Sequence, residues 1–284
     1  MKIKDLVDLT RPEHALMLAI AVIIGEIITF QGLPPLDLIL LSILPPIFIQ
    51  FGSFSLNDFL DVESDKLNKR LDRPLVRGEI KPETALYVAI ISFISGNLFA
   101  YFINPTCLLI SIVFSILAIL YNYKLKDIAL LGNAYIASTM AIPFIFGNFV
   151  VSKELTTLTI ILGAIAFIAG LAREIIKSIQ DMEGDIIARK SKTLPVIVGP
   201  RNSAYLAILL YIGLIKMSLV PYLFNYLSYS ILSILLLVLA DLLILVICIK
   251  VLSQTKEAFR FARSYSLIAL FLGLLSYLVA VFKI

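Results

Sequence analysis

Residues 57–65 read NDFLDVESD, and they follow directly on the apolar run 36–56. If the apolar run continues as a helix, with about 100° between successive residues, four polar side chains share an arc of about 100°. These four are Asn57, Asp58, Asp61 and Asp65. Carboxylates that share a helix face repel one another unless a cation lies between them, so this stretch predicts a divalent metal ion at the end of a helix.

A second acidic stretch, DMEGD at residues 181–185, also follows an apolar run. Asp181 and Asp185 are about 40° apart on a helix, so their carboxylates share one face. Acidic side chains at a helix carboxyl end are disfavoured by the helix dipole, by a few tenths to about 1 kcal/mol, and nearby cations offset this cost. Hard oxygen ligands in a partly open site suit Mg²⁺ that carries a phosphate-bearing substrate. We therefore expect a magnesium diphosphate as the ligand.

The composition excludes a soluble domain, because 60% of the 284 residues are hydrophobic, 15% are charged and the mean hydropathy is +0.98. Apolar runs long enough to cross a membrane predict an all-α membrane protein with about nine helices in one bundle around a central cavity. If the break near Pro221 is a kink in a continuous helix, eight spans remain. The predicted spans are 15–30, 36–56, 83–103, 106–121, 130–150, 156–176, 203–219, 229–250 and 262–282.

Lysine and arginine predict the orientation of the bundle, because cytoplasmic loops carry the positive excess. All but three of the 24 basic residues lie on the side of the membrane that carries both acidic stretches. Lys153 and Lys283 lie on the other side, and Lys216 lies within a span. We therefore expect the amino terminus in the cytoplasm and the carboxyl terminus outside.

The spans follow one another without a long linker or a low-complexity segment, which predicts a single domain over residues 1–284. The longest polar stretches, about 57–82 and 177–202, are expected to form loops that cap the cavity on the cytoplasmic side. Glu26 and Asp241 fall inside apolar spans, where each is a buried partner for a neighbouring helix or a cavity lining. We favour the structural role for Asp241 and leave both roles open for Glu26.

The pattern Asn57-Asp58-x-x-Asp61-x-x-x-Asp65, with Asp181-x-x-x-Asp185 in the second half, resembles the two aspartate motifs of the UbiA superfamily of intramembrane prenyltransferases. The resemblance extends to Asn68, Arg70 and Arg73-Pro74 after the first motif, and to the segment 121–126. It covers nearly the whole chain. It implies that a prenyl diphosphate is bound through Mg²⁺ between the two motifs, with its hydrocarbon tail in an apolar tunnel.

The resemblance also implies roles for single residues. Asp61, Asp65, Asp181 and Asp185 are the expected catalytic residues. The expected metal ligands are these four with Asn57 and Asp58. Asn57, Asp61 and Asp65 would hold one metal ion and Asp181 and Asp185 the other, and Asp58 would support the first of these ions indirectly. The expected contacts to diphosphate or substrate are Asn68, Arg70, Arg73, Tyr123, Lys124, Lys126, Arg173 and Lys177. Each of the basic residues is equally well placed to face lipid headgroups as a topology determinant.

The acceptor is not fixed by the motifs. The stretch from Asp61 to Pro74 is similar to the archaeal branch of the superfamily, which transfers a geranylgeranyl group to geranylgeranylglyceryl phosphate. We therefore expect a Mg²⁺-dependent enzyme of ether-lipid synthesis in the cell membrane, with lipid substrates and without a nucleic acid or protein partner. An aromatic-acceptor prenyltransferase of quinone synthesis is the alternative. A transporter of an anionic solute is more remote, because transporters place their polar sites near the midplane.

Overall fold

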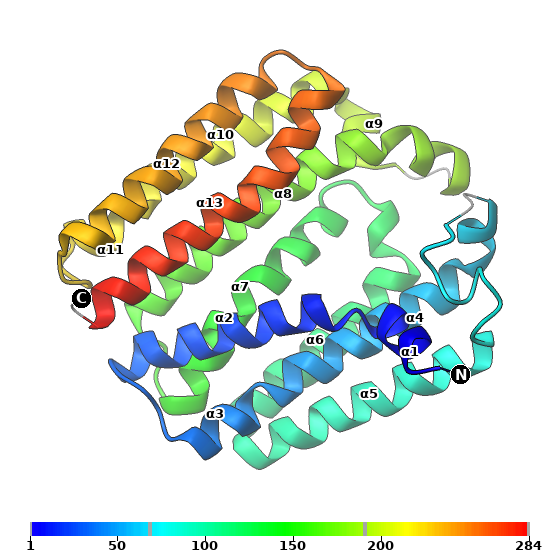
Figure 1. Ribbon diagram of the computed structural model, residues 1–284, viewed down its shortest axis with the longest axis horizontal. Helices are drawn as coiled ribbons and strands as arrows, with labels where there is room; N and C mark the ends of the chain where they lie inside the picture. The colour runs from blue at the N-terminus through cyan, green and yellow to red at the C-terminus, as the bar shows by residue number, and fades with distance from the viewer. Residues whose placement is uncertain (1, 68–69, 190–191, 283–284) are drawn as a thin grey trace.

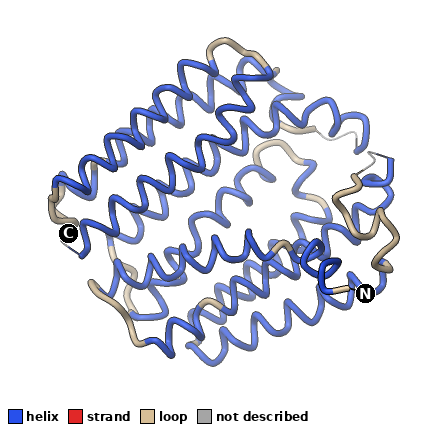
Figure 2. The backbone as a smooth tube through the Cα atoms, in the orientation of Figure 1, coloured by secondary structure: helices blue, strands red, loops and turns tan. Residues whose placement is uncertain are grey.

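Figure 1 shows the computed structural model, which describes residues 2–67, 70–189 and 192–282 of the chain. For some helical residues the structure describes the backbone but not the side chain, namely residues 67, 183–185 and 187–189. The described residues are almost all helical (Figure 2), and the β-structure among them is one isolated bridge between Ile128 and Lys192. The prediction of an all-α membrane protein is confirmed.

Nine helical segments of the described chain are long and apolar enough to cross a membrane, and each coincides with a predicted span. Five are single helices: α2 (Pro12–Phe30), α5 (Pro82–Ile103), α6 (Pro105–Tyr123), α7 (Leu131–Val151) and α8 (Thr157–Arg189). Two further spans are also single helices, α12 (Ile231–Val251) and α13 (Lys256–Phe282). The other two each combine two helices: α3 (Leu36–Ser42) with α4 (Leu44–Leu67), and α10 (Pro200–Ser218) with α11 (Val220–Leu223).

Short elements complete the chain: α1 (Ile3–Thr10), η1 (Leu125–Asp127) and α9 (Leu194–Val198). Pro221 lies in α11, and α12 begins only at Ile231, so the break at this proline ends a span. Four spans begin with proline at the first helical position, where the missing N–H has no intrahelical partner in any case. These prolines are Pro12, Pro82, Pro105 and Pro200.

The spans form two groups that face each other (Figure 1). In one group α4 packs against α2, α5 and α6, and in the other α8 and α10 pack with α12 and α13. The pairs α2–α7 and α7–α8 join the groups, whereas α4 approaches α8 at only a few residues. The two helices that carry the acidic motifs therefore stand on opposite sides of a central space.

Two predictions about the polar stretches need correction. Residues 57–67 and 177–189 were expected to be loop, but α4 continues to Leu67 and α8 continues to Arg189. Both motifs therefore lie within helices, and only the remainders of the predicted cap stretches leave helical geometry. The amino-terminal tail contains an unexpected helix, α1, whose Leu9 packs on Leu75 and Ile80 of the segment that follows α4.

Glycine allows a close contact between backbones at the crossing of α2 and α7. A Cβ atom on Gly25 would lie 2.6 Å from the carbonyl oxygen of Phe144. Small residues at such positions let helix backbones approach each other in a membrane. Glu26 is fully buried beside this contact and is absent from the cavity lining, so of its two predicted roles the structure favours the buried one.

Candidate functional site

A cavity of about 1300 Å³ lies between the two groups of helices. One end is lined by charged side chains from α4, α8, α13 and the segments between helices, and we call it the acidic end. Further along, the wall is formed almost entirely by apolar side chains of α2, α7, α8, α10, α12 and α13. A ligand that fits this cavity has a charged head and a long hydrocarbon part.

The first motif lines the acidic end from three successive turns of α4. Asn57, Asp61 and Asp65 all line the cavity, and both aspartates are otherwise buried. The side-chain amide of Asn57 donates to Oδ2 of Asp61 at 2.9 Å and to Oδ1 of Asn122 on α6 at 3.0 Å. This pair of bonds fixes the orientation of Asn57 and holds the Asp61 carboxylate against the cavity.

Basic side chains from outside α4 reach the same carboxylates. Lys126 in η1 donates to Oδ1 of Asp61 at 2.7 Å. Nε of Arg73 lies 3.9 Å from Oδ2 of Asp65. Arg70 lines the cavity too, and the bidentate hydrogen bond from its guanidinium to Asp72 raises the pKa of Arg70. The acidic end thus combines oxygen ligands with cations.

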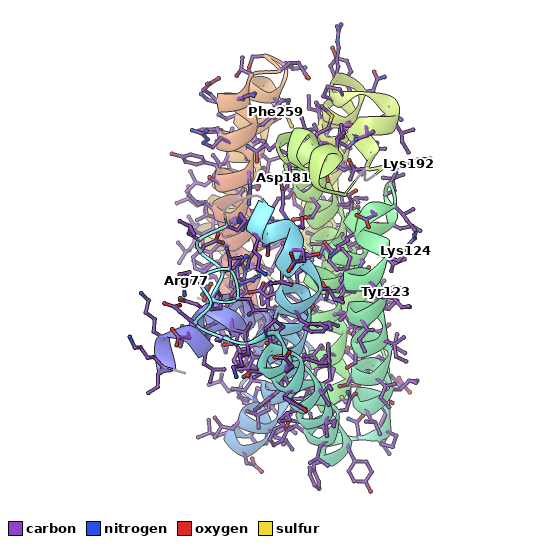
Figure 3. All side chains as sticks on the ribbon, turned by 90° about the vertical axis from the view of Figure 1, so that its right-hand side faces the viewer. Arg77, Tyr123, Lys124, Asp181, Lys192 and Phe259 are labelled. Atoms are coloured by element: carbon purple, nitrogen blue, oxygen red, sulfur yellow. The ribbon has the colours of Figure 1, made fainter. Side chains whose placement is uncertain are left out.

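The second motif faces the first from α8. Asp181 lines the cavity, and Figure 3 shows it over the middle of the bundle. Asp65 and Asp181 both contribute to the raised pKa of Arg70, so this arginine lies within electrostatic reach of both motifs. The side chain of Asp185 is outside the described part of the chain, as is the whole of Asn68. The predictions for these two residues stay predictions.

Arg173 and Lys177 line the cavity from the preceding turns of α8, and each is paired with a residue that the prediction missed. Nη1 of Arg173 lies 2.9 Å from Oε1 of Glu174, and Nζ of Lys177 lies 3.4 Å from Oε2 of the same side chain. Glu174 is buried, and the sequence signals for these pairs were its adjacency to Arg173 and its i, i+3 spacing from Lys177. The two cations are therefore fixed on the cavity wall by one carboxylate.

Asp58 does not take part in the cavity lining, so its place among the metal ligands does not fit as a direct contact, and its indirect support of the metal stays a prediction. Only 1% of the residue is exposed, and its Oδ1 contacts Nη2 of Arg11 and lies 3.3 Å from Nη1 of Arg73. Its observed role is to hold two cavity-lining arginines.

Arg11 is a site residue that the sequence reading missed. Its backbone has φ 50°, a left-handed conformation at the junction of α1 and α2. Its guanidinium lies 4.4 Å from the ring centre of Phe54, and His14 packs on the same ring. Arg11 lines the cavity. The charge had been counted only as a topology signal, because nothing in the local sequence pairs residue 11 with residue 58.

Tyr123 and Lys124 require the clearest correction. Tyr123 is 75% exposed and neither residue lines the cavity, so the expected contacts with diphosphate do not fit their positions. Figure 3 places both at the edge of the bundle. Tyr121 lines the cavity instead, stacked on Tyr135 with 4.7 Å between the ring centres. Two residues along a helix correspond to about 200°, so Tyr121 and Tyr123 face opposite directions.

The donor set of the acidic end fits Mg²⁺. Asp61, Asp65, Asp181 and the amide of Asn57 offer hard oxygens from two helices. Among the described residues, no three His, Cys, Asp or Glu side chains gather closely enough to form a cage by themselves. Mg²⁺ binds through one or two carboxylates together with water and substrate phosphates, so an open arrangement of this kind suits it.

Two segments between helices close over the acidic end. The amide of Lys192 donates to the carbonyl oxygen of Asp127 at 3.1 Å, which joins the segment after α6 to the segment after α8. Thr193, the next residue, lines the cavity. On the other side, Arg77 bonds Asp8 of α1 at 2.6 Å, and this ion pair fastens the segment that carries Arg70 and Arg73.

Such a bundle, with an acidic end that suits Mg²⁺ above a hydrocarbon-lined cavity, is that of a membrane-embedded enzyme for an anionic substrate with a long apolar chain. Residues 18–281 match the model of the UbiA prenyltransferase family. The chain belongs to this family and is a prenyltransferase that spans the membrane several times.

Curated relatives match over nearly the full chain. Digeranylgeranylglyceryl phosphate synthase of Archaeoglobus fulgidus is 36% identical, over 99% of this chain and 96% of its own length. The synthase of the same name from Methanosphaera stadtmanae is 33% identical, over 95% of this chain and 97% of its own length.

Solved structures have the same fold. A structure of a digeranylgeranylglyceryl phosphate synthase superimposes with a TM-score of 0.83 at 27% identity, covering 99% of both chains. A UbiA homologue from Archaeoglobus fulgidus, bound to DMAPP and Mg²⁺, superimposes with a TM-score of 0.72 at 19% identity, covering 96% of this chain and 99% of its own.

Proposed function

We propose that this protein transfers the geranylgeranyl group of geranylgeranyl diphosphate to geranylgeranylglyceryl phosphate in a Mg²⁺-dependent reaction of ether-lipid synthesis. The observation that carries the proposal is the position of Asp61 and Asp65 at the charged end of a cavity whose remaining wall is mostly apolar. The identity to synthases of this activity, over nearly the whole chain, supports the choice of acceptor.

The residues of the acidic end suit the bond changes of this reaction. The allylic C–O bond of the donor breaks, the diphosphate leaves, and a hydroxyl oxygen of the acceptor bonds to the allylic carbon and releases its proton. One Mg²⁺ would be held by Asn57, Asp61 and Asp65 and a second by Asp181 and Asp185, and these ions would supply charge stabilisation for the leaving diphosphate.

The chain's own cations add to this stabilisation, because fixed donors aimed at developing negative charge lower the barrier. Lys126, Arg70 and Arg73 stand next to the carboxylates of the first motif, and Arg173 and Lys177 stand on α8. The stacked ring of Tyr121 lies on the cavity wall, where its face suits a developing allylic cation. The apolar wall keeps water away from that carbon.

The proposal extends to topology. We place the acidic end at the cytoplasmic face of the cell membrane, because nearly all lysines and arginines flank the spans on that side. The amino terminus is then cytoplasmic and the carboxyl terminus outside. The family match over residues 18–281 supports one catalytic domain, closed by the segments around Arg73 and Thr193.

The test is product analysis by mass spectrometry. Purified protein with Mg²⁺ and geranylgeranyl diphosphate receives equal amounts of geranylgeranylglyceryl phosphate and 4-hydroxybenzoate. Digeranylgeranylglyceryl phosphate as the product supports the proposal. A prenylated benzoate moves the protein to the aromatic-acceptor branch of the family. The absence of both products overturns the proposed acceptor and also excludes the aromatic one.

A further inference from the structure

A group of polar side chains lies at the far end of the apolar part of the cavity. Asp241 of α12, Ser218 of α10 and Tyr277 of α13 all line the cavity there. The hydroxyl of Ser218 donates to Oδ2 of Asp241 at 2.9 Å, and the hydroxyl of Tyr277 donates to the carbonyl oxygen of Ser218 at 2.9 Å. We call these three residues the polar floor.

A carboxyl group in this place requires an explanation. Asp241 lies ten residues from the start of α12, which is the most apolar of the nine spans found in the described chain. Ionisable side chains in the middle of a span are costly and usually mark a function. Asp241 bonds a neighbouring helix, as we expected for a structural residue, but it also faces the cavity.

The wall between the acidic end and the polar floor is built for hydrocarbon. On α12, Ile244 lies one turn from Asp241 on the side of the acidic end and Leu237 one turn beyond it, and α13 adds Leu267, Leu270 and Leu274. Arg263 and Tyr277 mark the two ends of the lining on α13, and their separation of 14 residues corresponds to about 21 Å along the helix. A chain of several isoprene units, with its diphosphate at the acidic end, reaches the polar floor with its last carbons.

Further hydrogen bonds behind the polar floor oppose any extension of the cavity. The hydroxyl groups of Tyr222 and Ser276 lie 2.8 Å apart, and Ser276 donates to the carbonyl oxygen of Ser233 at 2.8 Å. All three residues are buried. A longer chain would have to separate these groups, or press a methyl group against a carboxyl that it cannot solvate, and both are unfavourable.

We propose that the polar floor sets the upper limit on the length of the prenyl chain that the enzyme accepts, with Asp241 as the specificity-determining residue. This inference rests on the proposed function, because it assumes that the cavity holds the prenyl chain of the diphosphate. It assigns chain-length selection to residues that lie far from the metal and from the reacting carbon.

Competitive binding tests the inference without using catalysis. Native mass spectrometry measures the ratio of bound geranylgeranyl diphosphate to a homologue one isoprene unit longer, offered in equal amounts with Mg²⁺. Asp241→Leu is expected to reduce the wild-type preference for the shorter chain by about tenfold, the scale of effects in an apolar pocket. Ser218→Ala, which leaves the carboxyl without its donor, is expected to reduce it less.

Two controls sharpen the result. Asp241→Asn keeps the size and the acceptor oxygen, so it should keep most of the preference. Leu242→Ala changes the adjacent residue, which is 52% exposed on the outer face of α12, and should keep all of it. If folded Asp241→Leu and Ser218→Ala both bind the two diphosphates in the wild-type ratio, the inference is wrong. This readout involves no acceptor, so it separates a failure of the polar floor from a failure of the proposed acceptor.

Discussion

Nζ of Lys126 lies 2.7 Å from Oδ1 of Asp61, although the two residues are 65 positions apart in the chain. The pair brings a cation from the segment after α6 to the central carboxylate of the α4 motif. Asn57 bonds the other oxygen of the same carboxylate at 2.9 Å. Both oxygens of Asp61 are thus positioned before a substrate arrives, and the cation next to them is ready to meet a diphosphate.

Lys126→Met should reduce kcat by about 10²-fold, because the leaving diphosphate loses one fixed cation. Lys124→Met is the matched control: Lys124 is two residues earlier, is exposed and lies outside the cavity lining, so its loss should leave kcat unchanged. Steady-state rates at saturating substrate measure both. Equal losses in the two variants would contradict the assignment.

Tyr121 and Tyr123 form a second matched pair. Tyr121→Leu should lower kcat/KM by about tenfold, because it removes the ring whose face is available to the allylic cation. Tyr123→Leu changes a side chain on the outer surface and should have no effect on kcat/KM. A loss that follows Tyr123 instead would mean that α6 presents its opposite face to the substrate.

Asp58 is expected to act on stability and not on the metal. Asp58→Asn leaves Arg11 and Arg73 without their buried partner, a change that typically costs about 3–5 kcal/mol. The Mg²⁺ concentration for half-maximal activity should stay the same in whatever folded enzyme remains. Thermal unfolding in detergent and a Mg²⁺ titration measure the two effects.

The control for Asp58 is Glu63→Gln on the same helix. The Glu63 side chain is 81% exposed and its ion pair within the described part of the chain is with Lys66 at the surface, so this substitution should change stability by no more than about 1 kcal/mol. A shifted Mg²⁺ requirement in Asp58→Asn would restore Asp58 as a metal ligand.

The contact between α2 and α7 offers a test of the packing. Gly25→Ala places a methyl group against the backbone of Phe144, which should destabilise the protein by about 1–3 kcal/mol. Gly213→Ala is made in a helix where nothing lies within 4 Å of the new Cβ, and it should be neutral or slightly stabilising. Unfolding temperatures in detergent compare the two. Equal temperatures would contradict the close packing.

Hydropathy was sufficient to predict the spans, because a helix that crosses lipid must be apolar over a fixed length. The spacing of Asp61 and Asp65 was sufficient to place both on one helix face, since that face depends only on helix geometry. The sequence could not tell which of Tyr121 and Tyr123 faces the cavity, because both lie at the end of a span whose rotation is set by its neighbours.

Long-range pairs were also beyond the sequence. Arg11 meets Asp58, and Asn57 meets Asn122, only when three helices have packed. Asp58 was therefore predicted to be a metal ligand, because it shares a helix face with Asn57, Asp61 and Asp65. In the structure it contacts Arg11 and Arg73 and does not line the cavity. The aspartates were placed on helix faces, yet residues 57–67 and 177–189 were still counted with the cap loops, because their polar residues resemble loop composition.

The most direct measurement of the central claim is turnover as a function of Mg²⁺ concentration for the wild type and for Asp61→Asn, Asp65→Asn and Asp181→Asn. The account predicts that EDTA abolishes wild-type turnover and that each variant folds but loses activity by about 10²-fold or more, with a raised Mg²⁺ requirement. Folded variants with the turnover and Mg²⁺ dependence of the wild type would show that these carboxylates do not hold the metal.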